Sequence, residues 1–170
     1  MSIPLWLPAL SPYVSDGNPD SYEKQLYECY LNSFVRSETR WRGLKIVINQ
    51  DPRDAKGRDW SYRHLTTIGV DPKRQFDQPR AERLPWIKPM LEASAPHVVT
   101  WAQPNRRIVV ALPDFFYIVI LDRLSRGDAA LLVTAYPVQR PKKRQEYSDE
   151  YQRARELVLP AVAQAEPSTK

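Results

Sequence analysis

Residues 97–138 carry the pattern that most narrows the possible folds of this chain. Four segments rich in β-branched and aromatic residues follow one another there: HVVTWAQ, RRIVVAL, FYIVILDR and AALLVTAYPV. The breaks between them contain the turn-forming sequences PN, PD and RGD. Such short breaks make neighbouring strands antiparallel, because a parallel crossover needs about a dozen residues or more. The sequence therefore predicts four consecutive antiparallel strands.

A first helix is predicted over about residues 20–37. Asp20 or Ser21 is the candidate N-cap, because short polar side chains accept hydrogen bonds from the first backbone amides of a helix. The apolar residues that follow at helical spacing are Leu26, Tyr27, Tyr30, Leu31 and Phe34.

Two more helices are predicted on either side of the strands. Residues 76–94 have apolar side chains at helical spacing, but Pro85 and Pro89 interrupt the run, so this helix is expected to be short or kinked. Residues 140–164 pass from basic to acidic composition, which is typical of a surface helix. The segment GLKIVINQDP, residues 43–52, indicates a short strand or an extended segment.

These elements predict an α+β fold in which N-terminal helices pack on a four-stranded antiparallel sheet and an additional helix follows at the C-terminal end. We expect the helices to cover one face of the sheet. The other face, or the sheet edge with its loops, is then open to a ligand.

The length of 170 residues and the hydrophobic content of 42% fit one domain with a substantial core. Residues 1–19 contain four prolines and are predicted to be an irregular strap, docked through Trp6 or Leu7. Residues 20–158 form the single α+β domain of this prediction. Residues 159–170 are expected to be a flexible tail.

The composition of the chain indicates which binding partners and which cellular compartment to expect. The formal charge of +5 is a weak indication of a polyanionic partner such as RNA or DNA. Cys29 is the only cysteine, so the chain has no intramolecular disulfide, which fits a reducing cytoplasm. The longest apolar runs are too short to cross a bilayer. We expect a soluble, unprocessed, cytoplasmic protein with no membrane partner.

His64 is the first candidate for chemistry. It lies in DWSYRHLTTIG, residues 59–69, beside arginine and threonine side chains. An imidazole titrates near neutral pH and can accept or return a proton, but a histidine satisfied inside the core is an equal alternative here. We interpret His97, at the start of a predicted strand, as structural.

The residue inventory excludes several chemistries. Two histidines, one cysteine and no acidic cluster predict no metal site and no cofactor. The phosphate-binding glycine loop, the nucleophile elbow and the dinucleotide fingerprint are not in the sequence. Cleavage of RNA remains compatible with the sequence, because the ribose 2′-hydroxyl is an internal nucleophile that needs only a base, cations and an acid.

Candidate residues for this reaction come from four segments. His64 is the candidate base or acid, and Thr134 or Tyr136 is a candidate for positioning the phosphate. The candidates for binding RNA phosphates are Arg63, Thr66, Arg80, Lys88 and Arg123. Each has a structural alternative: the arginines can pair with acidic neighbours on a solvated face, and Tyr136 can pack at the end of its strand.

Three segments suggest a family: RAERLPWIKPMLE, YIVILDRLSRGDAALLVTAYPV and RPKKRQEY. With them the chain resembles phage-associated members of the barnase, EndoU, colicin E5/D and RelE-like superfamily of small RNases and toxins. The resemblance covers roughly residues 40–150. It implies one or two N-terminal helices on a four-stranded antiparallel sheet. It also implies catalytic roles for His64, Arg83, Thr134 and Tyr136.

The expected function is therefore a metal-independent endoribonuclease of toxin type, with RNA as substrate and a cognate antitoxin or immunity protein as a possible partner. Two alternatives stay open. The chain is also compatible with a non-catalytic nucleic-acid-binding protein, in which Trp60, Tyr62 and Trp101 stack on bases. The second alternative is a protein-interaction module, such as an inhibitor of a host enzyme, that uses exposed tryptophans as anchors.

Overall fold

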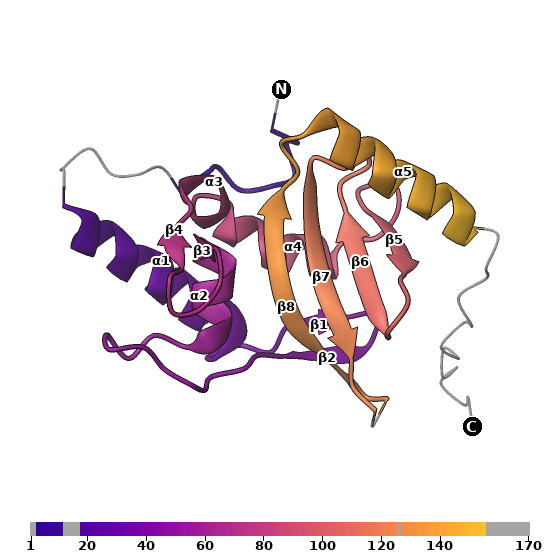
Figure 1. Cartoon of the computed structure of the whole chain (residues 1–170). Helices are drawn as coiled ribbons and strands as arrows, with labels where there is room; N and C mark the ends of the chain where they lie inside the picture. The colour runs from indigo at the N-terminus through magenta and orange to yellow at the C-terminus, as the bar shows by residue number, and fades with distance from the viewer. Residues whose placement is uncertain (1–2, 12–17, 126, 156–170) are drawn as a thin grey trace.

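The computed structural model describes residues 3–11, 18–125 and 127–155 (Figure 1). The predicted tail, residues 159–170, lies outside these residues, and so does part of the predicted N-terminal strap. Residues 3–11 contain no helix or strand. Leu7 is buried in the core, and the carbonyl of Pro8 accepts a hydrogen bond from the indole of Trp86 at 2.9 Å. This segment is thereby attached to the helical side of the molecule.

Helix α1, Pro19–Phe34, begins one residue before the predicted position and ends three before it. Its N-cap is Asn18, whose side chain accepts hydrogen bonds from the amides of Asp20 and Ser21, so the predicted caps at those two residues were wrong. Proline at the first helical position suits this start, because it has no amide hydrogen to satisfy. The buried positions recur every four residues, at Tyr22, Leu26, Tyr30 and Phe34.

The α+β class is confirmed, but the sheet is larger than predicted. Strands β5 (Val99–Ala102), β6 (Arg107–Ala111), β7 (Tyr117–Arg123) and β8 (Ala129–Pro137) form the predicted antiparallel meander. Strand β2 (Leu44–Val47) pairs with β8 in parallel, and β1 (Arg40–Trp41) pairs with β2. The sheet is therefore mixed and six-stranded, in the order β1-β2-β8-β7-β6-β5, and not a four-stranded antiparallel sheet.

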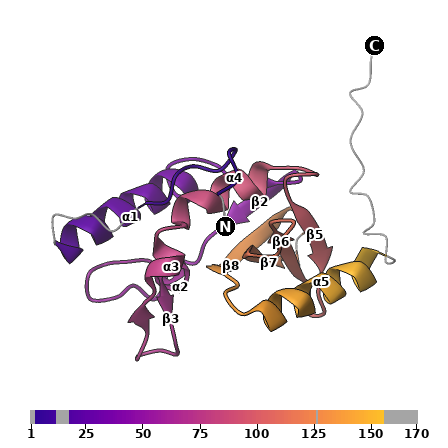
Figure 2. The same ribbon diagram turned by 90° about the horizontal axis from the view of Figure 1, so that it is seen from above.

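Both faces of this sheet are covered, contrary to the expectation that one face stays open. Helix α1, the helical turn η1 (Leu84–Trp86) and helix α4 (Ile87–Glu92) pack on the face that contains Val110, Val119 and Leu132. Helix α5, Pro141–Arg155, packs on the opposite face through Tyr147 (Figure 2). Alternation along β6 and β7 supplies apolar residues to both cores, and this is why α5 has a surface to bury.

The segment between β2 and the meander lies beside β8. It contains helix α2 (Trp60–Thr66), the short hairpin of β3 (Thr67–Ile68) and β4 (Gln75–Phe76), and helix α3 (Gln78–Ala81). Helix α3, η1 and α4 together form the predicted short or kinked helix, broken near Pro85. In the part of β8 that extends past β2, helices α2 and α3 take the place of a neighbouring strand (Figures 1 and 2).

His97 lies in a turn two residues before β5, and not in a strand as predicted. Its exposed ring lies 5.1 Å from that of Trp6, centroid to centroid. Among the described residues, no helix is both long enough and apolar enough to span a membrane.

Candidate functional site

Helix α2 places His64 at the junction of α2, α3 and β8. Tyr62 and Leu65 are buried and hold one side of this helix against the core. Arg63 and His64 follow the other side, where their side chains are 20% and 19% exposed. Both side chains are therefore partly shielded and still in contact with solvent.

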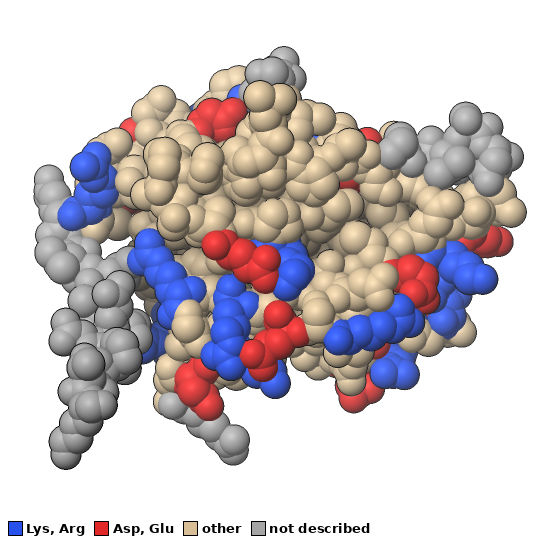
Figure 3. Space-filling model, turned by 180° about the vertical axis from the view of Figure 1, so that it is seen from behind, with Lys and Arg blue, Asp and Glu red and all other residues tan. Residues whose placement is uncertain are grey.

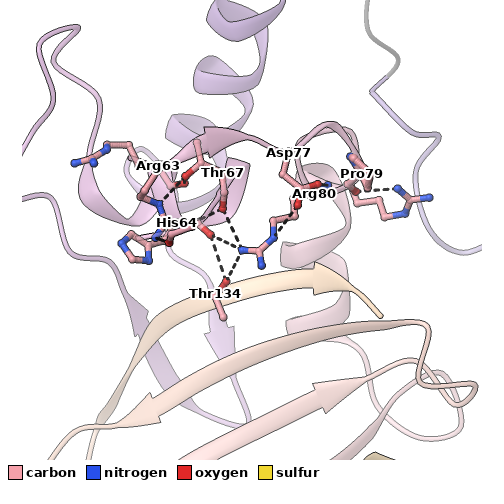
Figure 4. Close-up of polar contacts among 10 residues, drawn as sticks. Arg63, His64, Thr67, Asp77, Pro79, Arg80 and Thr134 are labelled. Carbon is pink, nitrogen blue, oxygen red and sulfur yellow. Dashed lines mark hydrogen bonds and ion pairs between the residues drawn. The ribbon is translucent and has the colours of Figure 1, made fainter. Parts of the chain in front are cut away.

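Arg80 of α3 joins the three elements (Figure 4). Its Nη1 donates to the carbonyl oxygens of His64 at 3.3 Å and of Thr67 at 3.2 Å, and to Thr134 Oγ1 at 3.4 Å. Thr134 Oγ1 in turn donates to the His64 carbonyl at 3.3 Å. The Arg80 Nε lies 3.4 Å from Asp77 Oδ2. One guanidinium thereby connects the middle of α2 to the C-terminal part of β8.

Tyr136 completes this arrangement from β8. The Arg80 guanidinium lies over its ring, 5.0 Å from the ring centroid. The Tyr136 hydroxyl lies 2.7 Å from that of Tyr147 in α5. A chain of contacts therefore runs from α3 through β8 to the helix on the opposite face of the sheet.

The imidazole of His64 has different neighbours from its backbone. It stacks on Trp60, with ring centroids 3.6 Å apart and ring planes 23° from parallel. Nε2 lies 3.8 Å from Asp71 Oδ2 and has no hydrogen bond within the described residues. Figure 4 shows the ring pointing away from Arg80 and Thr134, to which His64 presents its carbonyl. The imidazole is therefore held in place while one ring nitrogen stays unused.

The charges around His64 favour its neutral form. Burial lowers its pKa below the usual 6.5, and the positive charges of Arg74, Arg63 and Arg80 lower it further, while Asp71 acts in the opposite direction. Arg63 pairs with Asp71. Arg74 donates only to neutral oxygens among the described residues, those of Thr67 and Gly69. Arg63 and Arg80 are each paired with a carboxylate, so the charge of Arg74 makes this site positive overall, which suits a phosphate.

The structure thus brings together His64, Arg80, Thr134 and Tyr136, with Arg63 beside them. Arg83 of the predicted catalytic set faces elsewhere: it pairs with Glu82 at 2.6 Å, and its guanidinium lies over Trp86 and Phe116. The buried hydroxyl of Thr66 donates to the carbonyl of Tyr62.

Lys88 and Arg123, predicted to bind phosphate, lie away from this cluster. Lys88 bonds to Thr39 and Glu92 beside β1. The view from behind in Figure 3 shows basic and acidic side chains interleaved on that side of the molecule, which makes no continuous positive surface. Arg123 pairs with Ala130, four residues from Thr134 along β8, or roughly 13 Å along the strand.

Sequence reasoning missed Asp71, Arg74 and Tyr147 as parts of the site. Asp71 and Arg74 belong to the turn of the β3–β4 hairpin, and only its folding back onto α2 brings them to His64. Tyr147 reaches Tyr136 because α5 covers the face that was expected to be open. Trp60 was detectable as a neighbour of His64, since residues four apart share one side of a helix.

No family model, curated protein or solved structure matches this chain. No group of three or more histidine, cysteine, aspartate or glutamate side chains suited to a metal ion occurs in the described part of the chain.

Proposed function

We propose that this protein is a metal-independent endoribonuclease that cleaves RNA at the cluster formed by Arg63, His64, Arg80, Thr134 and Tyr136. The observation that carries the proposal is the position of Arg80 in α3, which joins the His64 carbonyl of α2 to Thr134 and Tyr136 of β8. The resemblance to the barnase, EndoU, colicin E5/D and RelE-like superfamily supports the same activity. It also makes a cognate antitoxin or immunity protein an expected partner.

The proposed reaction is an internal transfer. The 2′-oxygen attacks the adjacent phosphorus, and His64 Nε2 accepts the 2′-hydroxyl proton. The bond from phosphorus to the 5′-oxygen breaks, and that oxygen takes a proton from the imidazolium or from water. The products end in a 2′,3′-cyclic phosphate and a 5′-hydroxyl. No metal enters any of these steps.

The environment of His64 supports the role of base. Its pKa is lowered by burial and by neighbouring arginines, so the ring is neutral at pH 7 and able to accept a proton. Nε2 is buried and has no hydrogen-bond partner among the described residues, so no protein donor occupies its lone pair. Arg63, Arg74 and Arg80 supply positive charge for the phosphorane, which carries more negative charge than the phosphodiester.

Non-catalytic RNA binding is the second candidate, and the imidazole orientation favours it. The ring stacks on Trp60 and faces Asp71, while Thr134 lies on the other side of the His64 backbone. In this function the arginines hold phosphates and the histidine serves only to position α2.

The test is cleavage of end-labelled total RNA by the purified full-length protein in EDTA. His64→Ala is the test variant, and His97→Ala is its control, because His97 is exposed and lies in a turn far along the chain. Wild type and His97→Ala are expected to release fragments with 2′,3′-cyclic phosphate ends, and His64→Ala is expected to release none. Equal RNA binding without cleavage by all three proteins would reject the nuclease and favour the binding function.

A further inference from the structure

We infer, on the basis of the proposed function, that a cleft between α1, α2 and the β3–β4 hairpin binds one nucleotide of the RNA next to the phosphate at the arginine cluster. The inferred ligand is a nucleobase with an exocyclic amino group, stacked on Phe76. The cleft would thereby determine which RNA sequence is cut.

The cleft has the size and position that this ligand needs. Its volume is about 500 Å³, which falls within the range of small-ligand pockets. Its walls come from the start of α1, residues 54–56, helix α2 and the β3–β4 hairpin. None of these elements belongs to the meander, so the cleft lies beside the sheet and not within its core.

The cleft and the arginine cluster share a wall. Arg63 and Arg74 line the cleft, and the same two guanidiniums lower the pKa of His64. Arg74 is held by Thr67 Oγ1 at 2.7 Å and by the Gly69 carbonyl at 2.8 Å, which fixes its direction without neutralising its charge. A phosphate bound to these arginines has its attached nucleoside at the mouth of the cleft.

Phe76 supplies an aromatic surface for the base. It is 49% exposed although it is a large apolar residue in the wall of a cleft. Tyr22, which is 1% exposed, meets its ring edge-on at a centroid distance of 6.2 Å and an angle of 83°. The buried tyrosine supports the Phe76 ring from one side. Stacking on such a ring is the usual means by which proteins bind unpaired RNA bases.

Carboxylates in the cleft give the preference among bases. Asp20, Glu23 and Asp54 line it, and the Lys56 ammonium lies 3.3 Å from Asp20 and 2.6 Å from Glu23. A carboxylate accepts hydrogen bonds from the amino groups of adenine, cytosine and guanine. Uracil has no amino group. We therefore expect adenine, cytosine and guanine nucleotides to bind more tightly than uridine nucleotides.

Mononucleotides test the cleft without requiring cleavage, because they contain no internal phosphodiester. The experiment is calorimetric titration of the full-length protein with 5′-AMP, 5′-UMP and ribose 5-phosphate. Phe76→Ala is the test variant. Ile68→Ala is the matched control, since Ile68 belongs to the same hairpin, is 51% exposed and does not line the cleft.

We expect 5′-AMP to bind more tightly than 5′-UMP, and both more tightly than ribose 5-phosphate. Phe76→Ala should weaken 5′-AMP binding about tenfold, and Ile68→Ala should leave it unchanged. Equal binding of ribose 5-phosphate and 5′-AMP, equal effects of the two substitutions, or no saturable binding would overturn the inference.

The two proposals fail in different ways. Nucleotide binding that depends on Phe76, in a protein that cuts no RNA, would reject the nuclease and keep the nucleotide site. RNA cleavage by the wild type, together with 5′-AMP binding that is insensitive to Phe76→Ala, would reject the site and keep the nuclease.

Discussion

Replacing Arg80 by alanine should both destabilise the fold and abolish cleavage, because this side chain joins α2, α3 and β8. Its guanidinium makes three hydrogen bonds, one ion pair and one contact with an aromatic ring. The side chain is only 14% exposed. After its removal the His64 carbonyl still accepts from Thr134 and the Thr67 carbonyl from Arg74, so the loss consists of the contacts that Arg80 itself makes.

The contacts of Arg80 give the size of the expected loss in the free energy of unfolding. The three hydrogen bonds are long, at 3.2 to 3.4 Å, so about 0.5 kcal/mol is reasonable for each. The contact with the ring of Tyr136 contributes about 1 kcal/mol, and the ion pair with Asp77 about 0.5 kcal/mol. The expected loss in the free energy of unfolding is therefore about 3 kcal/mol. For a domain of this size that lowers Tm by roughly 6–12 °C.

Thermal unfolding followed by circular dichroism measures this loss, and cleavage of labelled RNA below Tm measures the effect on activity. Arg80→Lys should lose about half as much free energy of unfolding as Arg80→Ala, because an ammonium keeps the charge but cannot reach all of the same oxygens. Both variants should cut RNA at least about 100-fold more slowly. Arg107→Ala is the control, since Arg107 is exposed at the start of β6. If Arg80→Ala melted within about 2 °C of wild type, the bridging role would be refuted.

Two further predictions concern His64 and Tyr147. The pKa of His64 is lowered in the folded protein, so below about pH 6.5 the unfolded chain binds more protons and the free energy of unfolding falls. Urea unfolding should therefore show a smaller loss of stability from pH 7 to pH 5 in His64→Gln than in wild type, and equal losses would contradict the shift. Tyr147→Phe removes the hydroxyl that contacts the Tyr136 hydroxyl. It should lower the free energy of unfolding by about 1 kcal/mol and slow RNA cleavage. Tyr151→Phe keeps the same aromatic cluster intact, so a similar loss in both variants would show that the hydroxyl contact is not the cause.

Local sequence was enough to predict the meander and α1. Each strand of the meander pairs with its neighbour in the chain through a short turn, so alternation and turn residues within 42 residues contain the necessary information. The apolar spacing of α1 likewise depends only on residues one or two turns apart. Four of the predicted site residues, His64, Arg80, Thr134 and Tyr136, also meet in the structure.

Tertiary structure alone decided the rest. Lys45 pairs with Ala129, which lies 84 residues further along the chain, and no local pattern indicates a partner at that separation. Helix α5 packs on the face of the sheet whose apolar residues the other helices do not cover. Tyr147 reaches Tyr136 for this reason, whereas Asp71 and Arg74 reach His64 because the β3–β4 hairpin folds back onto α2. Local propensities depend on nearest neighbours, whereas these contacts form only after distant segments have packed, so chain order does not reveal them.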